Sequence, residues 1–349
     1  MAMADLTIRG AGIFGLSIAW ICARRGARVQ VIDPHGAGTG ASGGLVGALA
    51  PHVPENWNAK KAFQLDSLLA AQGFWAEVEA AGGVPSGYGR TGRLQPIADD
   101  HALSLAQARA ATARDLWQGH AIWRVIPEAE AGPWAPVSPT GELIHDTLSA
   151  RMHPRRACSA LVAALWAKNV HVVPKAKDQG AVIWATGVTG LDELSIGRPR
   201  PVGIGVKGQA ALLAPSKPLP VNAPQLFADA LHIIPHADGT VAIGSTSENS
   251  YDDPFNTDAQ LDAVITRARA QVPALADARV TDRWAGLRPR ARSRAPMLGG
   301  WPDRPGHYIA NGGFKIGYGV APGVARVMAD LVLDGQDSIP DDFRVEASL

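Results

Sequence analysis

The sequence predicts an α/β protein in which a domain with a parallel sheet is interleaved with a domain that has an antiparallel sheet. Glycine turns that join a strand to a helix occur at three separate places, and the stretches between them combine helices with alternating strands. The 349 residues are enough for two such domains with a sizeable core. We expect residues 1–60, 145–200 and 290–349 in the first domain, and residues 61–144 and 201–289 in the second.

The first 33 residues have the pattern of a Rossmann-like unit, with a strand, a tight turn, a helix and a second strand. Gly10, Gly12 and Gly15 form a G-x-G-x-x-G motif between strand and helix, and Asp33 ends the second strand. The first glycine allows the turn, the second lets a pyrophosphate approach the backbone, and the third lets helix and strand pack closely. Asp33 can accept hydrogen bonds from both ribose hydroxyls and would repel a 2′-phosphate. The motif therefore predicts an ADP-containing dinucleotide and disfavours NADP.

Three later features favour FAD over NAD as this dinucleotide. Residues 36–51 are rich in Gly and Ala, which suits a backbone lying against a ligand better than a free loop. A second glycine turn follows the apolar strand in residues 181–187, and a third turn, Gly312–Gly313, precedes the last helix. FAD is long enough to need contacts from all three places. A helix that starts near Gly319 would aim its positive end at the N1–C2=O edge of a flavin.

The remaining elements are predicted from hydrophobic periodicity and from helix caps. Thr257 and Gln260 have the spacing of a capping box and predict the start of one more helix. The other expected elements are helices over residues 59–81, over 100–118 and from Pro154 to Asn169, and antiparallel strands within 202–213 and 231–245.

The composition argues against several classes of protein. Lys and Arg number 33 and Asp and Glu 32, so no basic excess indicates a nucleic-acid partner. No apolar run reaches the ~18 residues of a membrane-spanning helix. Cys22 and Cys158 have no metal-ligand spacing, and His232 and His236 share a strand face without a third ligand, so we expect no metal. Few cysteines and an N-terminus unlike a signal peptide predict a cytoplasmic protein without a membrane span.

Several motifs, in their order along the chain, resemble the D-amino-acid oxidase superfamily of FAD-dependent amine and amino-acid oxidases, in particular the glycine oxidases of thiamine biosynthesis. The resemblance covers nearly the whole chain. It implies an FAD-binding first domain and an α+β substrate-binding second domain, hydride transfer from an amine Cα to flavin N5, and an imine product. The cysteine that binds flavin covalently in some relatives has no counterpart, so non-covalent FAD is expected. The resembling stretches are GAGIFGLSIAW, GASGGLVGALAPH, HPRRACSALVAAL, WATG, VKGQAALL, HIIPHADGTVAIGSTSE and WAGLRP.

The resemblance also implies roles for individual side chains. Arg288 matches the arginine that binds the substrate carboxylate in glycine oxidases, where a guanidinium fits a carboxylate bidentately; the alternative is a surface cation. Lys315 stands where relatives similar to sarcosine oxidase carry a carboxylate-binding lysine, the alternative again being a surface charge. His232 replaces a tyrosine that faces the substrate, and it could orient the amine or be an ordinary strand histidine. Asn311 replaces a second arginine of glycine oxidases.

The expected catalytic residues are therefore Arg288, Lys315 and His232, while Arg290, Arg292 and Arg294 have no match in the family and are expected to be solvated. The expected FAD contacts come from the N-terminal motif, the Gly/Ala-rich segment and the two later turns. They are Gly10, Ala11, Gly12, Ile13, Phe14, Gly15, Asp33, Pro34, Gly40, Ala41, Ser42, Val46, Gly47, Ala48, Ala185, Thr186, Gly187, Arg288, Asn311, Gly312, Gly313, Phe314, Lys315 and Ile316.

The expected activity is oxidation of glycine or another small amino acid or secondary amine. The imine would give an oxo acid and ammonia, molecular oxygen would become hydrogen peroxide, and thiamine biosynthesis is the expected context. Positioning of the amine is then the main catalytic task. One alternative is a dehydrogenase of D-amino acids or N-methyl amino acids that passes electrons to a quinone or a partner. Another is a flavin-holding subunit or RNA-modifying domain of a complex, which the net charge of +1 disfavours. By analogy with the family, a homo-oligomer is possible.

Overall fold

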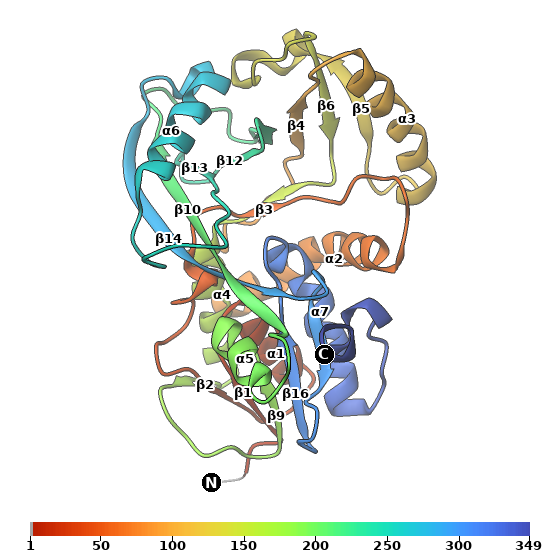
Figure 1. The fold of residues 1–349 in the computed structure, drawn as a ribbon, viewed down its shortest axis with the longest axis vertical. Helices are drawn as coiled ribbons and strands as arrows, with labels where there is room; N and C mark the ends of the chain where they lie inside the picture. Colours follow the sequence, from red (N-terminus) through yellow and green to blue (C-terminus); the bar gives the residue numbers. More distant parts are fainter. Residues whose placement is uncertain (1–2) are drawn as a thin grey trace.

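The structure, a computed structural model, describes residues 3–349, which form two regions (Figure 1). The lower region in this view contains a mostly parallel sheet with helices around it, and the upper region contains a mostly antiparallel sheet. Two long strands, β10 (Gly203–Ala214) and β14 (Arg279–Ala291), pair along their length and extend from the upper region into the lower one. The predicted fold class, a parallel and an antiparallel sheet in one interleaved α/β chain, is confirmed.

The first sheet has six strands in the order β15-β16-β9-β1-β2-β8. All neighbouring pairs are parallel except β15 with β16. Segments from the beginning, the middle and the end of the chain thus lie side by side in one sheet. In sheet order the strands are β15 (Met297–Gly300), β16 (His307–Asn311), β9 (Ala181–Trp184), β1 (Leu6–Arg9), β2 (Val29–Ile32) and β8 (Val172–Val173).

Helices pack around this first sheet, and all of them except the one over residues 187–195 share one apolar core with it; that helix belongs to a separate apolar cluster and packs mainly on β10 and β14. The helix over residues 59–82 falls in the range expected for the second domain, yet it packs against the helices that begin at residues 154 and 317. It does so because Phe63, Leu68 and Trp75 form a buried stripe along it. The helices of this region are α1 (Ile13–Arg24), α2 (Ala59–Gly82), α4 (Pro154–Trp166), α5 (Gly187–Ser195) and α7 (Gly317–Asp334).

The second sheet has eight strands in the order β14-β10-β13-β12-β11-β4-β6-β5, and only β11 and β4 pair in parallel. One face of the sheet is apolar and is covered by α6 (Ala259–Gln271). A separate short sheet joins β3 (Ala48–Leu49) to β7 (Ala150–Arg151), and α3 (Asp100–Trp117) packs on β5. The other strands are β13 (Val241–Gly244), β12 (Leu231–Pro235), β11 (Gln225–Ala228), β4 (Arg93–Pro96), β6 (Glu142–Asp146) and β5 (Trp123–Pro127).

Most predicted elements are present, and one helix start is a correction. α6 begins at Ala259, and its N-cap is Asp258, whose carboxylate accepts a hydrogen bond from the Gln260 N–H at 2.9 Å. The predicted capping box of Thr257 and Gln260 is therefore wrong, because an aspartate one residue later takes the cap and the Gln260 side chain donates elsewhere. The helix that opens at Pro154 ends at Trp166, before the expected residue 169.

Two further properties concern only residues 3–349. None of the helices in this part of the chain has the length and apolar character that crossing a bilayer requires. The same residues contain no group of three or more His, Cys, Asp or Glu side chains placed to hold a metal ion. Short 3-10 turns complete the described structure at Ala41–Gly43, Glu128–Trp134, Pro273–Leu275, Asp341–Phe343 and Val345–Ser348.

Candidate cofactor and substrate site

The G-x-G-x-x-G turn between β1 and α1 is built for close approach of backbones. Gly10 has φ +98°, and a Cβ at this position would lie 2.3 Å from the carbonyl oxygen of Ala185. A Cβ on Gly15 would lie 1.9 Å from the carbonyl oxygen of Gly10, so α1 can pack on the turn only with glycine here. Gly12 is the N-cap of α1, and the Leu16 N–H is bonded back to its carbonyl. The N–H groups before Leu16 are thus at the helix end, where an anion binds well.

Two side chains hold this turn and add oxygen atoms to it. Asp33 lies just after β2, and its carboxylate accepts hydrogen bonds from the Ala11 N–H at 2.8 Å and the His35 N–H at 2.9 Å. The Ser42 hydroxyl accepts a hydrogen bond from the Ile13 N–H at 2.9 Å. Carboxylate and hydroxyl oxygens have more than one lone pair, so both groups keep capacity for a ribose hydroxyl or a phosphate.

The two later glycine turns lie beside the first. The Ala185 N–H donates to the Arg9 carbonyl at 2.7 Å, and a Cβ on Gly313 would lie 2.9 Å from the Phe14 ring. The Asn311 amide donates to the Gly187 carbonyl at 2.7 Å and accepts from the N–H of the next residue at 2.8 Å. Asn311 therefore ties the second and third turns together. The structure brings the three predicted turns to one place.

The Gly/Ala-rich segment runs from this place to the second sheet. Leu45 packs against Ala210, Ile234 and Ala242 on the sheet face opposite α6. Gly47 meets the chain around residue 152, since a Cβ on it would lie 1.8 Å from that residue's carbonyl oxygen. The segment therefore lies between the dinucleotide turn and the second sheet, as a backbone that lines a ligand should.

The sheet face opposite α6 carries the polar side chains. Residues paired across neighbouring strands point to the same side, and residues two apart in a strand do so too. The register then places Arg288, Gly208, His232 and Arg93 on one face, although they come from β14, β10, β12 and β4. We call this the substrate face, meaning the side of the eight-stranded sheet that bears these four residues.

Arg288 is buried on the substrate face, with 8% of its surface exposed. Its side chain crosses Gly208, where a Cβ would lie 1.3 Å from Nη2. Nη2 donates to the Ser245 hydroxyl at 2.9 Å and to the Thr246 carbonyl at 3.0 Å, whereas Nη1 is buried without a hydrogen-bond partner among residues 3–349. Burial lowers the pKa of Arg288 to about 10, against the charge of Glu248, so the group stays cationic at neutral pH. The alternative of a surface cation is excluded.

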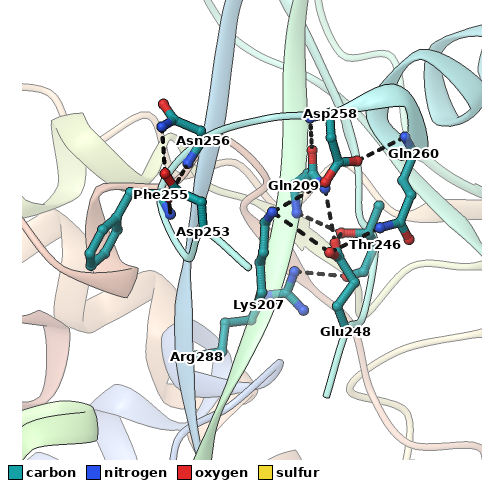
Figure 2. Close-up of polar contacts among 10 residues, drawn as sticks. All are labelled: Lys207, Gln209, Thr246, Glu248, Asp253, Phe255, Asn256, Asp258, Gln260 and Arg288. Carbon is teal, nitrogen blue, oxygen red and sulfur yellow. Dashed lines mark hydrogen bonds and ion pairs between the residues drawn. The ribbon is translucent and has the colours of Figure 1, made fainter. Parts of the chain in front are cut away.

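A network of polar side chains, several of them buried, lies near Arg288 (Figure 2). Glu248 accepts hydrogen bonds from the Gln209 amide at 3.0 Å and from the Thr246 hydroxyl. Lys207 lies 3.8 Å from the Glu248 carboxylate and 3.2 Å from that of Asp258. The network fixes the chain segment that supplies the acceptors of Arg288, and so it helps to fix the guanidinium.

His232 is surrounded by positive charge. Burial lowers its pKa to about 3, and the charges of Arg93, Lys315 and Arg288 lower it further. The ring packs against Phe227 with 4.8 Å between ring centroids, and its Nδ1 is buried without a partner among residues 3–349. His232 is therefore neutral at physiological pH, with one ring nitrogen available to a ligand.

Lys315 and Arg290 both lie near the Phe314 ring. Their charged groups are 5.6 Å and 5.5 Å from its centroid. Partial burial lowers the pKa of Lys315, and the charges of Arg288 and Arg290 add to this effect. The prediction that Arg290 is solvated holds only in part, because the residue is half-buried and donates to Asn249 at 3.1 Å in an exposed contact. The other two arginines expected in solvent, at positions 292 and 294, are exposed.

Comparison with known proteins decides the family. Residues 5–331 match the family of FAD dependent oxidoreductases called DAO. The chain belongs to this family. The resemblance found in the sequence motifs is thereby confirmed, and so is FAD as the cofactor.

Individual relatives agree with this assignment. The bifunctional protein ThiO/ThiG of Synechocystis sp. is 28% identical over 95% of this chain and 52% of its own length, so the chain spans about half of that relative. The putative thiamine biosynthesis oxidoreductase ThiO of Rhizobium etli is 27% identical over 95% of this chain and 97% of its own length. Glycine oxidase from Geobacillus kaustophilus has the same fold, with a TM-score of 0.84, 19% identity and 98% of each chain covered. Iminodiacetate oxidase from Chelativorans sp. has a TM-score of 0.85 at 22% identity, covering 97% of this chain and 98% of its own.

The residues present fit the FAD of this DAO family. The start of α1 offers N–H groups to a phosphate, and Asp33 and Ser42 offer oxygen acceptors beside it. The Thr186 hydroxyl is buried in the second turn without a hydrogen-bond partner among residues 3–349, which is expected of a group that binds a ligand. The start of α7 has no side-chain cap, so its N–H groups face the third turn.

Neither cysteine is placed to act as a nucleophile. Both are buried thiols, in α1 and α4. Burial raises the pKa of Cys22 to about 12 and that of Cys158 to about 11. A thiol with such a pKa stays protonated at neutral pH and does not attack a flavin ring.

Several residues of the site were missed in the sequence. Arg93 lies in the alternating stretch RLQP, where a charged residue between glycine and leucine could have indicated a functional strand position. Gly208 and Ser245 gave no local signal, because their importance comes from the side chain of Arg288, far along the chain. Arg9 has a role that the sequence did not indicate: its partly exposed side chain pairs with Asp178 at 2.8 Å and lies over the ring of a tryptophan in β9.

Proposed function

We propose that this flavoprotein oxidises a small amino acid or secondary amine at the carbon that bears its amine. One observation carries the proposal: the buried guanidinium of Arg288 has its Nη1 without a partner among residues 3–349. The same guanidinium donates to Ser245, and a Cβ on the preceding residue, Gly244, would lie 3.0 Å from Val46 of the segment that leads to the FAD turn. A buried charged donor needs an acceptor, and a carboxylate matches a guanidinium best. The names of the relatives, glycine oxidase and ThiO, support an amino acid as the bearer of that carboxylate.

In this proposal the side chains position the substrate. Arg288 and Lys315 bind the carboxylate, and His232 offers a neutral ring nitrogen to the amine. The surrounding positive charges disfavour an ammonium group, so the amine binds in its neutral form. Because the pKa of His232 is about 3, this residue orients the amine and does not hold its proton at neutral pH. FAD, when bound through non-covalent contacts, supplies the two-electron acceptor.

In the proposed reaction, water hydrolyses the imine and molecular oxygen accepts the electrons. The amine loses two electrons and two protons and becomes an imine, and water converts the imine to an oxo acid and ammonia or a free amine. Molecular oxygen takes the electrons and becomes hydrogen peroxide. The ThiO names of several relatives favour thiamine biosynthesis as the context.

The experiment is anaerobic mixing of the purified holoprotein with glycine, with N-methylglycine and with D-alanine, each separately, while the flavin absorbance is followed. Bleaching by at least one of them is expected. Admission of air then distinguishes an oxidase, which regains its colour with one hydrogen peroxide per turnover, from a dehydrogenase that stays bleached until a quinone is added. No bleaching by any amine would contradict the proposal and favour a flavoprotein that acts only with a partner.

A further inference from the structure

The substrate face carries a second buried arginine that the proposed reaction does not use. Arg93 is 6% exposed and lies at the start of β4. Its register partner on β11 is Gln225, and Phe227, two residues further on, pairs with His232 on β12. Arg93 therefore lies on the same face as His232, on the side away from Arg288.

The guanidinium of Arg93 pairs with a carboxylate through one nitrogen and has another nitrogen without a hydrogen-bond partner. Its Nε lies 2.9 Å from the fully buried carboxylate of Asp146, which also accepts hydrogen bonds from the Ser149 N–H at 2.8 Å and the Ser149 hydroxyl at 3.0 Å. The Nη2 group of Arg93, in contrast, is buried without a hydrogen-bond partner among residues 3–349. Buried donors of a charged group are costly to leave without acceptors, so this arrangement indicates a ligand.

Three groups in a row on this face thus lack partners: Nη1 of Arg288, Nδ1 of His232 and Nη2 of Arg93. The strand order β14-β10-β13-β12-β11-β4 puts the histidine between the two arginines. The positive charges of both arginines and of Lys315 act on the His232 ring, as the direction of its pKa shows. Neither Arg288 nor Lys315 forms an ion pair with a carboxylate of residues 3–349, so a ligand with one carboxylate leaves positive charge uncompensated.

We infer that the preferred substrate has an amine flanked by two carboxylates, one bound by Arg288 and the other by Arg93. The class comprises N-carboxymethyl amino acids and amino-dicarboxylates. This inference rests on the proposed function for the amine, but the binding of a dicarboxylate does not. Arg93 becomes a specificity-determining residue, and glycine becomes a poorer substrate that fills one end of the site.

The first test measures binding without turnover. The oxidised holoprotein is titrated with succinate and with butyrate, which have the same chain length and no amine, and the flavin absorbance is followed. We expect succinate to bind about tenfold more tightly or better, because a second charged hydrogen bond is gained. In Arg93→Gln the two affinities become about equal, and the affinity for butyrate changes less than about twofold. Arg93→Lys retains part of the preference.

Controls separate recognition from folding. Arg124 is an exposed arginine on β5, and Arg124→Gln should leave the preference unchanged. Arg93→Gln leaves Asp146 buried without its cation, so the double variant Arg93→Gln/Asp146→Asn is tested as well. Equal affinities in the wild-type protein, or an unchanged preference in an Arg93 variant that still holds FAD, would overturn the inference.

Turnover gives the second test and keeps the two proposals apart. N-(carboxymethyl)glycine and N-methylglycine are the same secondary amine with and without the second carboxylate, and the first should have a kcat/KM about tenfold higher or more. If N-methylglycine bleaches the flavin and dicarboxylates gain nothing, the inference fails and the proposed function stands. If dicarboxylates bind through Arg93 but no amine bleaches the flavin, the proposed function fails and the second anion site stands.

Discussion

The dinucleotide turn and the substrate face bind a charged ligand with different groups. At the turn, backbone N–H groups bind the ligand, and glycines at fixed spacing let the backbone come close: a Cβ at Gly15 would lie 1.9 Å from the carbonyl oxygen of Gly10. On the substrate face, buried side chains bind the ligand, and each comes from a different strand. Glycine appears there too, but Gly208 makes room for the guanidinium of Arg288 instead of for a ligand. A backbone site tolerates few changes of residue within the turn, whereas a side-chain site can change its substrate by single substitutions.

The largest effect on substrate binding should come from removing the Arg288 side chain from the substrate face. Arg288→Ala removes a buried charged donor, and we expect the KM for a carboxylated amine to rise roughly 100-fold or more. FAD content should stay the same, because the dinucleotide turn is not touched. Arg292→Ala, an exposed arginine on the same stretch, is the matched control. Unchanged kinetics in Arg288→Ala would show that this arginine does not bind substrate.

A smaller effect should follow when Arg288 is displaced rather than removed. Gly208→Ala places a methyl group where Nη2 of the arginine lies, so the guanidinium must move and the KM should rise about tenfold or more. Gly73→Ala serves as the control, since a Cβ there meets nothing within 4 Å and a helix gains from alanine. If Gly208→Ala has normal kinetics with FAD bound, substrate binding does not depend on the observed position of the Arg288 guanidinium.

The backbone site is tested by a change that spares the substrate face. Asp33→Ala removes the acceptor of the Ala11 N–H and of the expected ribose hydroxyls. We expect the dissociation constant of FAD to rise about tenfold, with little change in the KM of the protein that still holds FAD. Fluorescence titration of the apoprotein with FAD measures this. A change in KM without a change in FAD affinity would mean that the two regions are not separate in function.

The smallest effect concerns pH and stability. Burial lowers the pKa of His232 to about 3, from 6.5 for an unperturbed histidine, so the ring binds its proton more weakly in the folded state. Stability that is present above the unfolded pKa is therefore lost as the pH falls toward the folded pKa. In His232→Gln the stability between pH ~6 and ~4 should depend less on pH, by up to one proton or ~1.4 kcal/mol per pH unit. Urea unfolding at several pH values measures the slope, and equal slopes in both proteins would refute the buried, neutral state.

The same contrast explains what could be predicted from the sequence. The dinucleotide turn could be predicted because its glycines, Ser42 and Asp33 act within one local motif, and the periodicity of the surrounding helices is strong. The capping box at Thr257 failed because two cap residues, Thr257 and Asp258, stand side by side and sequence alone does not choose between them. Arg290 was expected in solvent, because its contact with Phe314 depends on a turn far along the chain.

The substrate face was harder to predict for a physical reason. Arg288 and Lys315 could be selected only through the resemblance to a family. Arg93 belongs to the same face as Arg288 through five strand pairings, between β4, β11, β12, β13, β10 and β14, which no local pattern shows. Strand order decides which charged side chains lie close together on a sheet. Strand order depends on the whole chain, so a local sequence pattern does not reveal it.

One measurement tests the central claim most directly, namely that the buried arginine binds the carboxylate of an amine substrate. Anaerobic flavin reduction is followed with glycine and with methylamine, which lacks the carboxylate, in the wild-type protein and in Arg288→Ala. We predict that the wild-type protein is reduced far more efficiently by glycine, by roughly 100-fold or more, and that the variant loses most of this preference while methylamine is little affected. A preference for glycine that survives in the variant would contradict the account.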